Sequence, residues 1–149
     1  MSQASMSEMS SETRSVVVEQ EFAHAPERVW RALTEGDLIS EWLMKNDFQP
    51  VVGHCFQFRM DPMPHWDGVI TCEVLAVEPP ERLAYSWGAL GLESVVAWTL
   101  TRTAGGTLVR MEHSGFGADQ EAAYKGATYG WQKFIGGLER VLAGLEERS

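Results

Sequence analysis

The sequence has little cysteine, and its cysteines are not arranged as a framework. Its 149 residues contain only Cys55 and Cys72, with no C-x-x-C pair. In a cytoplasmic protein two such cysteines do not indicate a disulfide. The two-residue period of the strands expected around them directs Cys72 inward and Cys55 outward. This difference argues further against a bond between the two thiols.

Positive charge and long apolar runs are also scarce. Lys and Arg number 12 against 21 Asp and Glu, which gives a formal net charge of −9. No run of basic residues offers a surface to nucleic acid or anionic lipid, so we expect neither partner. No apolar run reaches the roughly 18 residues of a membrane span. Residues 1–13, MSQASMSEMSSET, lack the basic and apolar regions of a secretory signal. We expect a disordered leader there and a cytoplasmic location.

The motifs of metal and nucleophilic chemistry are missing as well. No histidine has an i,i+4 histidine partner. His65 lies beside Asp61 and Asp67, an arrangement more typical of a solvated turn than of a metal site. No G-x-S-x-G motif is present, and the glycines of GALGLE join two expected strands rather than a strand and a helix. We therefore expect no metal site and no cofactor.

Aromatic residues, in contrast, are plentiful. The chain carries six Trp and six Phe, and 44% of its residues are apolar. This composition is that of a globular protein long enough to bury a core. It predicts large buried surfaces or an aromatic-lined cavity.

The order of periodic segments predicts an α+β fold. A strand over 15–22 precedes two short helices over 24–35 and 36–43, the first with Pro26 at its first position and the second with Asp37 as N-cap. A meander of strands then leads to one long helix from about Asp119 to Glu147. The expected strands of the meander are 54–60, 69–78, 82–87, 94–101 and 107–114. A twisted antiparallel sheet of this size can curl around the closing helix, so residues 14–149 form a single domain.

The closing helix carries an unusual number of glycines. Each costs about 1 kcal/mol against Ala in a helix interior. Gly126, Gly130 and Gly137 lie with Ala123 on a narrow stripe beside the aromatic face of the helix. A stripe without Cβ atoms permits close packing against the sheet or leaves room for a ligand. Gly136 and Gly144 lie off this stripe, and we expect neither of them to have such a role.

Four segments resemble a known family in their order and spacing. They are FAHAPERVWRALTEGDLISEWL, VEPPERLAYSW, GGTLVRMEHSGF and YGWQKFIGGLERVL. The chain is similar to the activators of the heat-shock protein 90 ATPase, in their large bacterial branch, within the START-related SRPBCC superfamily. The resemblance covers about residues 15 to 145. It implies the helix-grip fold, a curved antiparallel sheet of about seven strands around a long C-terminal helix, with two short helices after the first strand.

The same resemblance implies a cavity between sheet and helix that holds an apolar small molecule in many relatives. We therefore expect the chain to bind an apolar or aromatic small molecule, as a monomer or a homodimer. The side chains expected to line the cavity point inward by strand or helix period. They are Trp42, Phe56, Phe58, Met60, Tyr85, Trp87, Trp98, Met111, His113, Tyr124, Thr128, Trp131 and Ile135.

Two alternatives remain open from the sequence. In the first, the chain is a cyclase or hydrolase that uses His113 or Tyr85 as acid or base. No second carboxylate or histidine stands at an obvious inward position to assist them. In the second, the chain is a co-chaperone of heat-shock protein 90, an activity that the resemblance associates with larger relatives. Because the same fold serves carriers, receptors, enzymes and co-chaperones, the fold does not choose among them.

Overall fold

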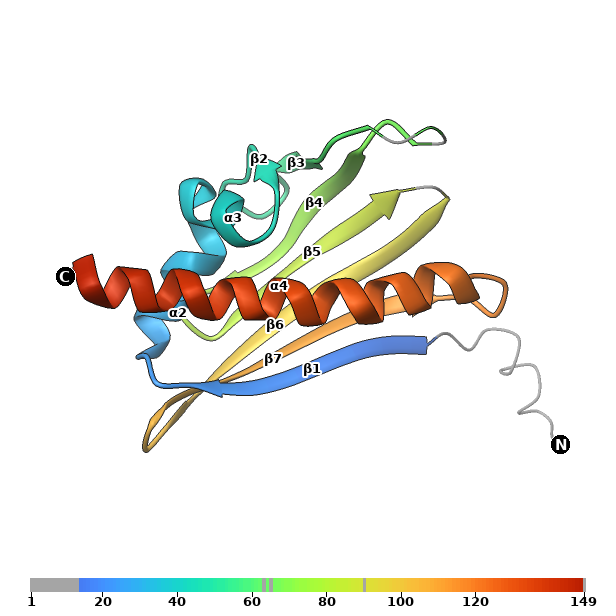
Figure 1. The fold of residues 1–149 in the computed structure, drawn as a ribbon. Helices are drawn as coiled ribbons and strands as arrows, with labels where there is room; N and C mark the ends of the chain where they lie inside the picture. Colours follow the sequence, from blue (N-terminus) through green and yellow to red (C-terminus); the bar gives the residue numbers. More distant parts are fainter. Residues whose placement is uncertain (1–13, 63, 65, 90, 149) are drawn as a thin grey trace, which may run out of the picture.

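A computed structural model describes residues 14–62, 64, 66–89 and 91–148 (Figure 1). The expected leader over 1–13 and His65 lie outside the described residues. Seven strands form one antiparallel sheet in the order β1-β7-β6-β5-β4-β3-β2. The strands are β1 (Arg14–Phe22), β2 (Lys45–Asn46), β3 (Cys55–Arg59), β4 (Val69–Glu78), β5 (Arg82–Ala89), β6 (Leu92–Thr103) and β7 (Gly106–Phe116). The sequence did not predict β2, because two residues are too short to show a period.

Within the part of the chain that the structure describes, three helices accompany the sheet: α2 (Pro26–Thr34), α3 (Gly36–Trp42) and α4 (Glu121–Arg148). Pro26 begins α2, as predicted. The prediction that Asp37 caps α3 is wrong. Glu35 adopts an extended backbone (φ −95°, ψ 120°) that ends α2 and begins α3, so Asp37 falls inside the first turn of α3.

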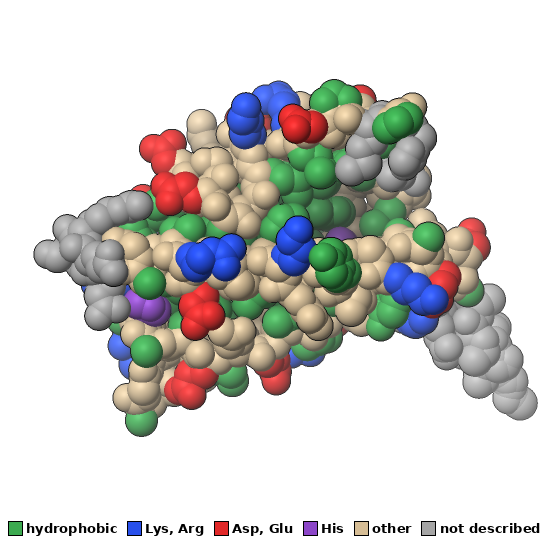
Figure 2. Space-filling model, in the orientation of Figure 1, with side chains coloured by type: hydrophobic (Ala, Val, Ile, Leu, Met, Phe, Trp, Pro, Cys, Tyr) green, Lys and Arg blue, Asp and Glu red, His purple; other side chains and the backbone are tan. Residues whose placement is uncertain are grey.

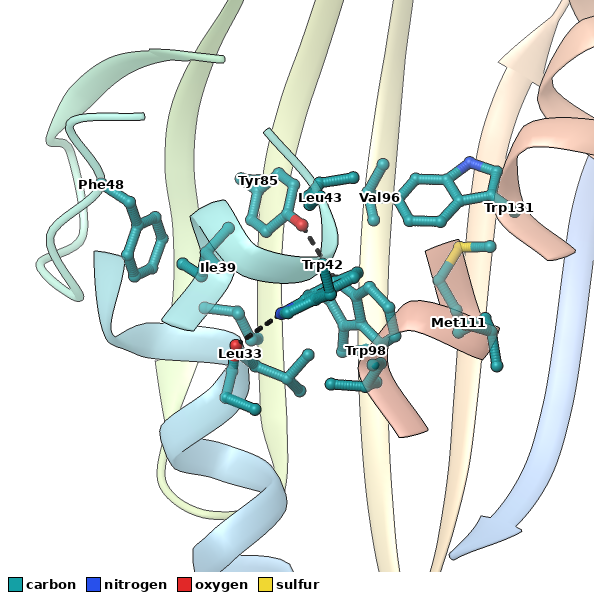
Figure 3. Packing of buried hydrophobic residues seen from close by; sticks show 14 of the residues in the cluster. Leu33, Ile39, Trp42, Leu43, Phe48, Tyr85, Val96, Trp98, Met111 and Trp131 are labelled. Carbon is teal, nitrogen blue, oxygen red and sulfur yellow. Dashed lines mark hydrogen bonds between the residues drawn. The ribbon is translucent and has the colours of Figure 1, made fainter. Parts of the chain in front are cut away.

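Helix α4 lies across the inner face of the curved sheet and gives the helix-grip arrangement (Figure 1). Its C-terminal half contacts α2 and α3 and buries Leu138 and Leu142 completely. Figure 3 shows the aromatic part of this core, where Trp98, Met111 and Trp131 converge from β6, β7 and α4. The alternation of buried and exposed residues along β1, β4 and β6 follows the predicted period and places one face of the sheet inside.

The two cysteines lie on neighbouring strands and on opposite faces of the sheet. Cys72 pairs with Phe56 and is buried, whereas Cys55 pairs with Glu73 and is exposed. Both thiols are free, which confirms the absence of a bond between them. Burial raises the pKa of the Cys72 thiol to about 12, so Cys72 is an inert core residue.

Candidate functional site

A hydrophobic cavity of about 400 Å³ opens between the N-terminal half of α4 and the sheet. Figure 2 shows the hollow above α4 with hydrophobic side chains around it. Its lining consists of Met44, Met60, Trp66, Ile70, Trp87, Ala89, Leu92, His113, Phe116, Ala123, Gly126, Ala127, Gly130, Trp131 and Phe134. No acidic, Lys or Arg side chain is among these lining residues. A second hollow of the surface is bordered by the charged side chains Glu27, Arg82 and Arg102, so its lining is not apolar like that of this cavity.

The structure brings four of the predicted residues to the cavity: Met60, Trp87, His113 and Trp131. Trp87 comes from β5, His113 from β7 and Trp131 from α4, and the ring centroids of Trp87 lie 5.3 Å from His113 and 5.4 Å from Trp131. Met60 follows the end of β3 and is 41% exposed. The three rings form the inner end of the cavity, and Met60 stands at its open side.

The other predicted residues do not line this cavity. Seven are buried in the core, where they pack against one another: Trp42, Phe56, Phe58, Tyr85, Trp98, Met111 and Ile135. Strand and helix periods give only the face on which a residue lies, and most of that face is closed by packing. Two further residues, Tyr124 and Thr128, lie on α4 next to lining residues. The Tyr124 ring packs edge-on against Phe116, and the Thr128 hydroxyl donates to the Tyr124 carbonyl at 2.9 Å.

Trp42 is the clearest example of a residue that the sequence predicts at the cavity and the structure places in the core. Its indole Nε1 donates to the Ala32 carbonyl at 2.9 Å, and its ring meets Trp98 edge-on at 5.7 Å (Figure 3). A Cβ built at Gly137 would lie 3.4 Å from the Trp42 carbonyl oxygen. Trp42 therefore joins α3 to the C-terminal half of α4 in the core.

The glycine stripe of α4 divides into two parts with different roles. At Gly137 the backbone of α4 approaches α3 so closely that only a methyl group would fit. At Gly126 an added Cβ would meet no atom within 4 Å, and at Gly130 it would meet only the Phe134 ring at 3.8 Å. Gly126 and Gly130 line the cavity with Ala123. The glycines thus give close packing at one end of the helix and open space at the other.

Phe116 is a lining residue that strand period alone does not find. Gly115 has a φ of 111°, a conformation that favours glycine, and the pairing of β1 with β7 passes from Ser114 to Phe116 at this point. The bulge brings Phe116 to the same face as His113, and the two ring centroids lie 4.7 Å apart. A glycine within a strand is the signal for such a bulge.

His113 is buried and both of its ring nitrogens are engaged. The Trp131 indole Nε1 donates to Nδ1 at 2.9 Å, and an indole nitrogen can only donate. The neutral ring therefore carries its proton on Nε2, which donates to the Ser94 hydroxyl at 2.8 Å. Ser94 in turn donates to the Trp87 carbonyl at 2.7 Å. This chain of hydrogen bonds fixes the tautomer and leaves no ring nitrogen for a ligand.

The two candidate acid-base residues are poorly suited to proton transfer. Burial lowers the pKa of His113 to about 4, which keeps the ring neutral at pH 7. Burial also raises the pKa of Tyr85 well above its usual range, and the Tyr85 hydroxyl accepts a hydrogen bond from Trp98 Nε1 at 3.0 Å. Tyr85 is 3% exposed and does not line the cavity. The described residues contain no cluster of His, Cys, Asp and Glu able to hold a metal ion.

The family described as Activator of Hsp90 ATPase homolog 1-like protein matches residues 23–143. The chain belongs to this family. A solved structure of protein MLL2253 from Mesorhizobium loti is 52% identical, covers 87% of this chain and 97% of its own, and superposes with a TM-score of 0.83. No curated protein matches the chain.

Two further members of the fold extend the comparison. DynU16, a protein in the dynemicin biosynthetic locus, is 27% identical over 87% of this chain and 47% of its own, with a TM-score of 0.74. CalU16 from Micromonospora echinospora is 24% identical over 92% of this chain and 81% of its own, with a TM-score of 0.72, and shows the fold alone. Within the described residues, no helix is long and apolar enough to cross a membrane.

Proposed function

We propose that the protein binds an apolar or aromatic small molecule in the cavity between α4 and the sheet. The observation that carries the proposal is the apolar enclosure of about 400 Å³, lined by Trp87, Phe116, Trp131 and Phe134. Small-molecule sites of proteins have volumes of about 300–1,000 Å³ and mostly apolar walls. The place of DynU16 in a biosynthetic locus supports a role toward small molecules, since its domain shares this fold.

The glycines of α4 give independent support. Two helical glycines that touch almost nothing cost the helix about 1 kcal/mol each against Ala. Gly126 and Gly130 supply no turn and no close backbone approach, since an added Cβ at either would meet open space or one distant ring atom. Their effect on the structure is to widen the cavity, and a bound ligand would occupy the space that the missing side chains leave.

The hydrogen bonds around His113 support binding over catalysis. An acid or base must exchange a proton with a substrate, but both His113 nitrogens are engaged and the Tyr85 hydroxyl lies in the core. The site therefore favours a carrier or receptor over the cyclase or hydrolase alternative. Burial of the ligand between aromatic walls supplies the affinity.

Native mass spectrometry of gently purified protein is the first test. A retained molecule adds a reproducible mass that is lost on denaturation. The uncharged dye N-phenyl-1-naphthylamine then serves as a probe, because its emission rises in an apolar site. Gly126→Leu places a side chain in the cavity and is expected to weaken dye binding at least about tenfold. The matched control is Gly136→Ala on the same helix, since Gly136 does not line the cavity. Equal dye binding by all three proteins would refute the proposed site.

A further inference from the structure

Among the described residues of the cavity wall, all but one of the side-chain N–H groups donate a hydrogen bond to another protein group. Four lining residues carry a side-chain N–H: Trp66, Trp87, His113 and Trp131. Trp66 Nε1 donates to the Val69 carbonyl at 3.2 Å. Trp131 donates to His113, and His113 donates to Ser94. Only the indole of Trp87 has no acceptor among the described residues.

The Trp87 indole lies on the cavity side of the sheet. Its ring packs against Phe58 at 5.4 Å, and against His113 and Trp131, all of which belong to the inner face. The Trp87 residue is 8% exposed, yet its Nε1 is not fully enclosed by protein atoms. Trp87 lines both this cavity and a neighbouring hollow at the turn between β5 and β6. The contacts of its ring with Phe58, His113 and Trp131 favour the cavity as the space that the remaining surface of the nitrogen faces. An N–H in such a position costs free energy unless it finds an acceptor.

The charge of the lining is equally restrictive. Among the described residues that line the cavity, none is acidic, Lys or Arg, and His113 is held neutral. An ion that entered would lose its hydration and gain no counter-charge. From these observations we infer that the ligand is an uncharged aromatic molecule with one hydrogen-bond acceptor, such as a carbonyl oxygen, that receives the Trp87 N–H. This inference rests on the proposed function and specifies the ligand class of the same cavity.

Three tricyclic probes of nearly the same shape test the inference: fluorenone, fluorene and fluorene-2-carboxylate. The first offers a carbonyl acceptor, the second offers none, and the third is an anion. Calorimetric titration should show fluorenone binding about tenfold more tightly than fluorene, the effect of one added hydrogen bond. The carboxylate should bind at least about thirtyfold more weakly than fluorene.

The variant Trp87→Phe removes the N–H and keeps an aromatic ring. It should abolish the preference for fluorenone. The matched control is Trp66→Phe, which removes another lining indole whose N–H is already bonded to Val69. Trp66→Phe should lower both affinities by the same factor and leave their ratio at about ten. If Trp87→Phe fails to fold, the wild-type protein still reports: its Trp87 indole proton should shift downfield in the NMR spectrum with fluorenone and not with fluorene.

The outcomes separate the two proposals. Equal binding of fluorenone and fluorene to the wild-type protein would overturn the role of Trp87, and so would a preference that survives Trp87→Phe. Tighter binding of the carboxylate would overturn the uncharged class. Each of these results would leave the cavity as a binding site. Failure of all three probes to bind would overturn the proposed function itself, and this inference with it.

Discussion

The free energy of unfolding should fall as the pH is lowered from 7 to 5, because His113 takes up a proton in the unfolded chain and not in the folded protein. Burial lowers the pKa of His113 from 6.5 to about 4. Between these values the unfolded chain binds a proton at this residue and the folded protein does not, so stability rises with pH across the window and is lost as the pH falls. At pH 5 the difference amounts to about 2 kcal/mol of the free energy of unfolding.

The structure explains why the charged form is unfavourable. A protonated ring would carry a second N–H at Nδ1, directed at the Trp131 Nε1–H that now donates to it. Two donors would then face each other at 2.9 Å in an apolar enclosure. The neutral Nε2–H tautomer is therefore the form that fits, and NMR of the ring nitrogens should find it at pH 7.

Urea unfolding at pH 7 and pH 5 measures this effect when it is compared with the variant His113→Gln. The Gln side chain has an acceptor for Trp131 and a donor for Ser94 but does not titrate. The wild-type protein should lose about 2 kcal/mol more than the variant between the two pH values. Carboxylates that titrate in the same range are common to both proteins and cancel in the comparison. An equal loss in both proteins would refute the assignment of a buried neutral histidine.

Three substitutions test the packing that surrounds the site. Gly126→Leu should raise the melting temperature by about 2–4 °C, because it replaces a helical glycine and fills open space; a lower melting temperature would show that the space is not there. Gly137→Leu should lower the free energy of unfolding by about 1–3 kcal/mol, because only a methyl group fits beside Trp42. Denaturant titration measures this loss, with Gly137→Ala as the tolerated control. Equal stability of the two variants would contradict the close packing at Gly137. Tyr85→Phe should cost about 1–3 kcal/mol in the same titration, because the buried Trp98 N–H loses its acceptor; an unchanged midpoint would contradict that hydrogen bond.

Much of this architecture could be predicted from the sequence because it depends on local periodicity. The strand over 69–78 has the predicted bounds, and the long helix begins within two residues of its predicted start. The alternation of Val16, Val18 and Phe22 predicts which face of the first strand turns inward. Strand β2 could not be predicted, since it is defined only by its pairing with Arg59 and Phe58 on β3.

The cavity itself was decided by tertiary structure. Period assigns a side chain to a face, but packing decides whether that face is closed, as it is around Phe56 and Trp98, or open, as it is beside Trp87. The bulge at Gly115 turns Phe116 toward the cavity. The two-residue period of the strand therefore does not predict Phe116 as a lining residue. The engagement of His113 depends on Trp131 and Ser94, which lie 18 and 19 residues away in the chain and meet it only in the fold. A sequence therefore specifies which residues turn inward, whereas the curvature of the sheet and the placement of α4 determine which of them line the cavity.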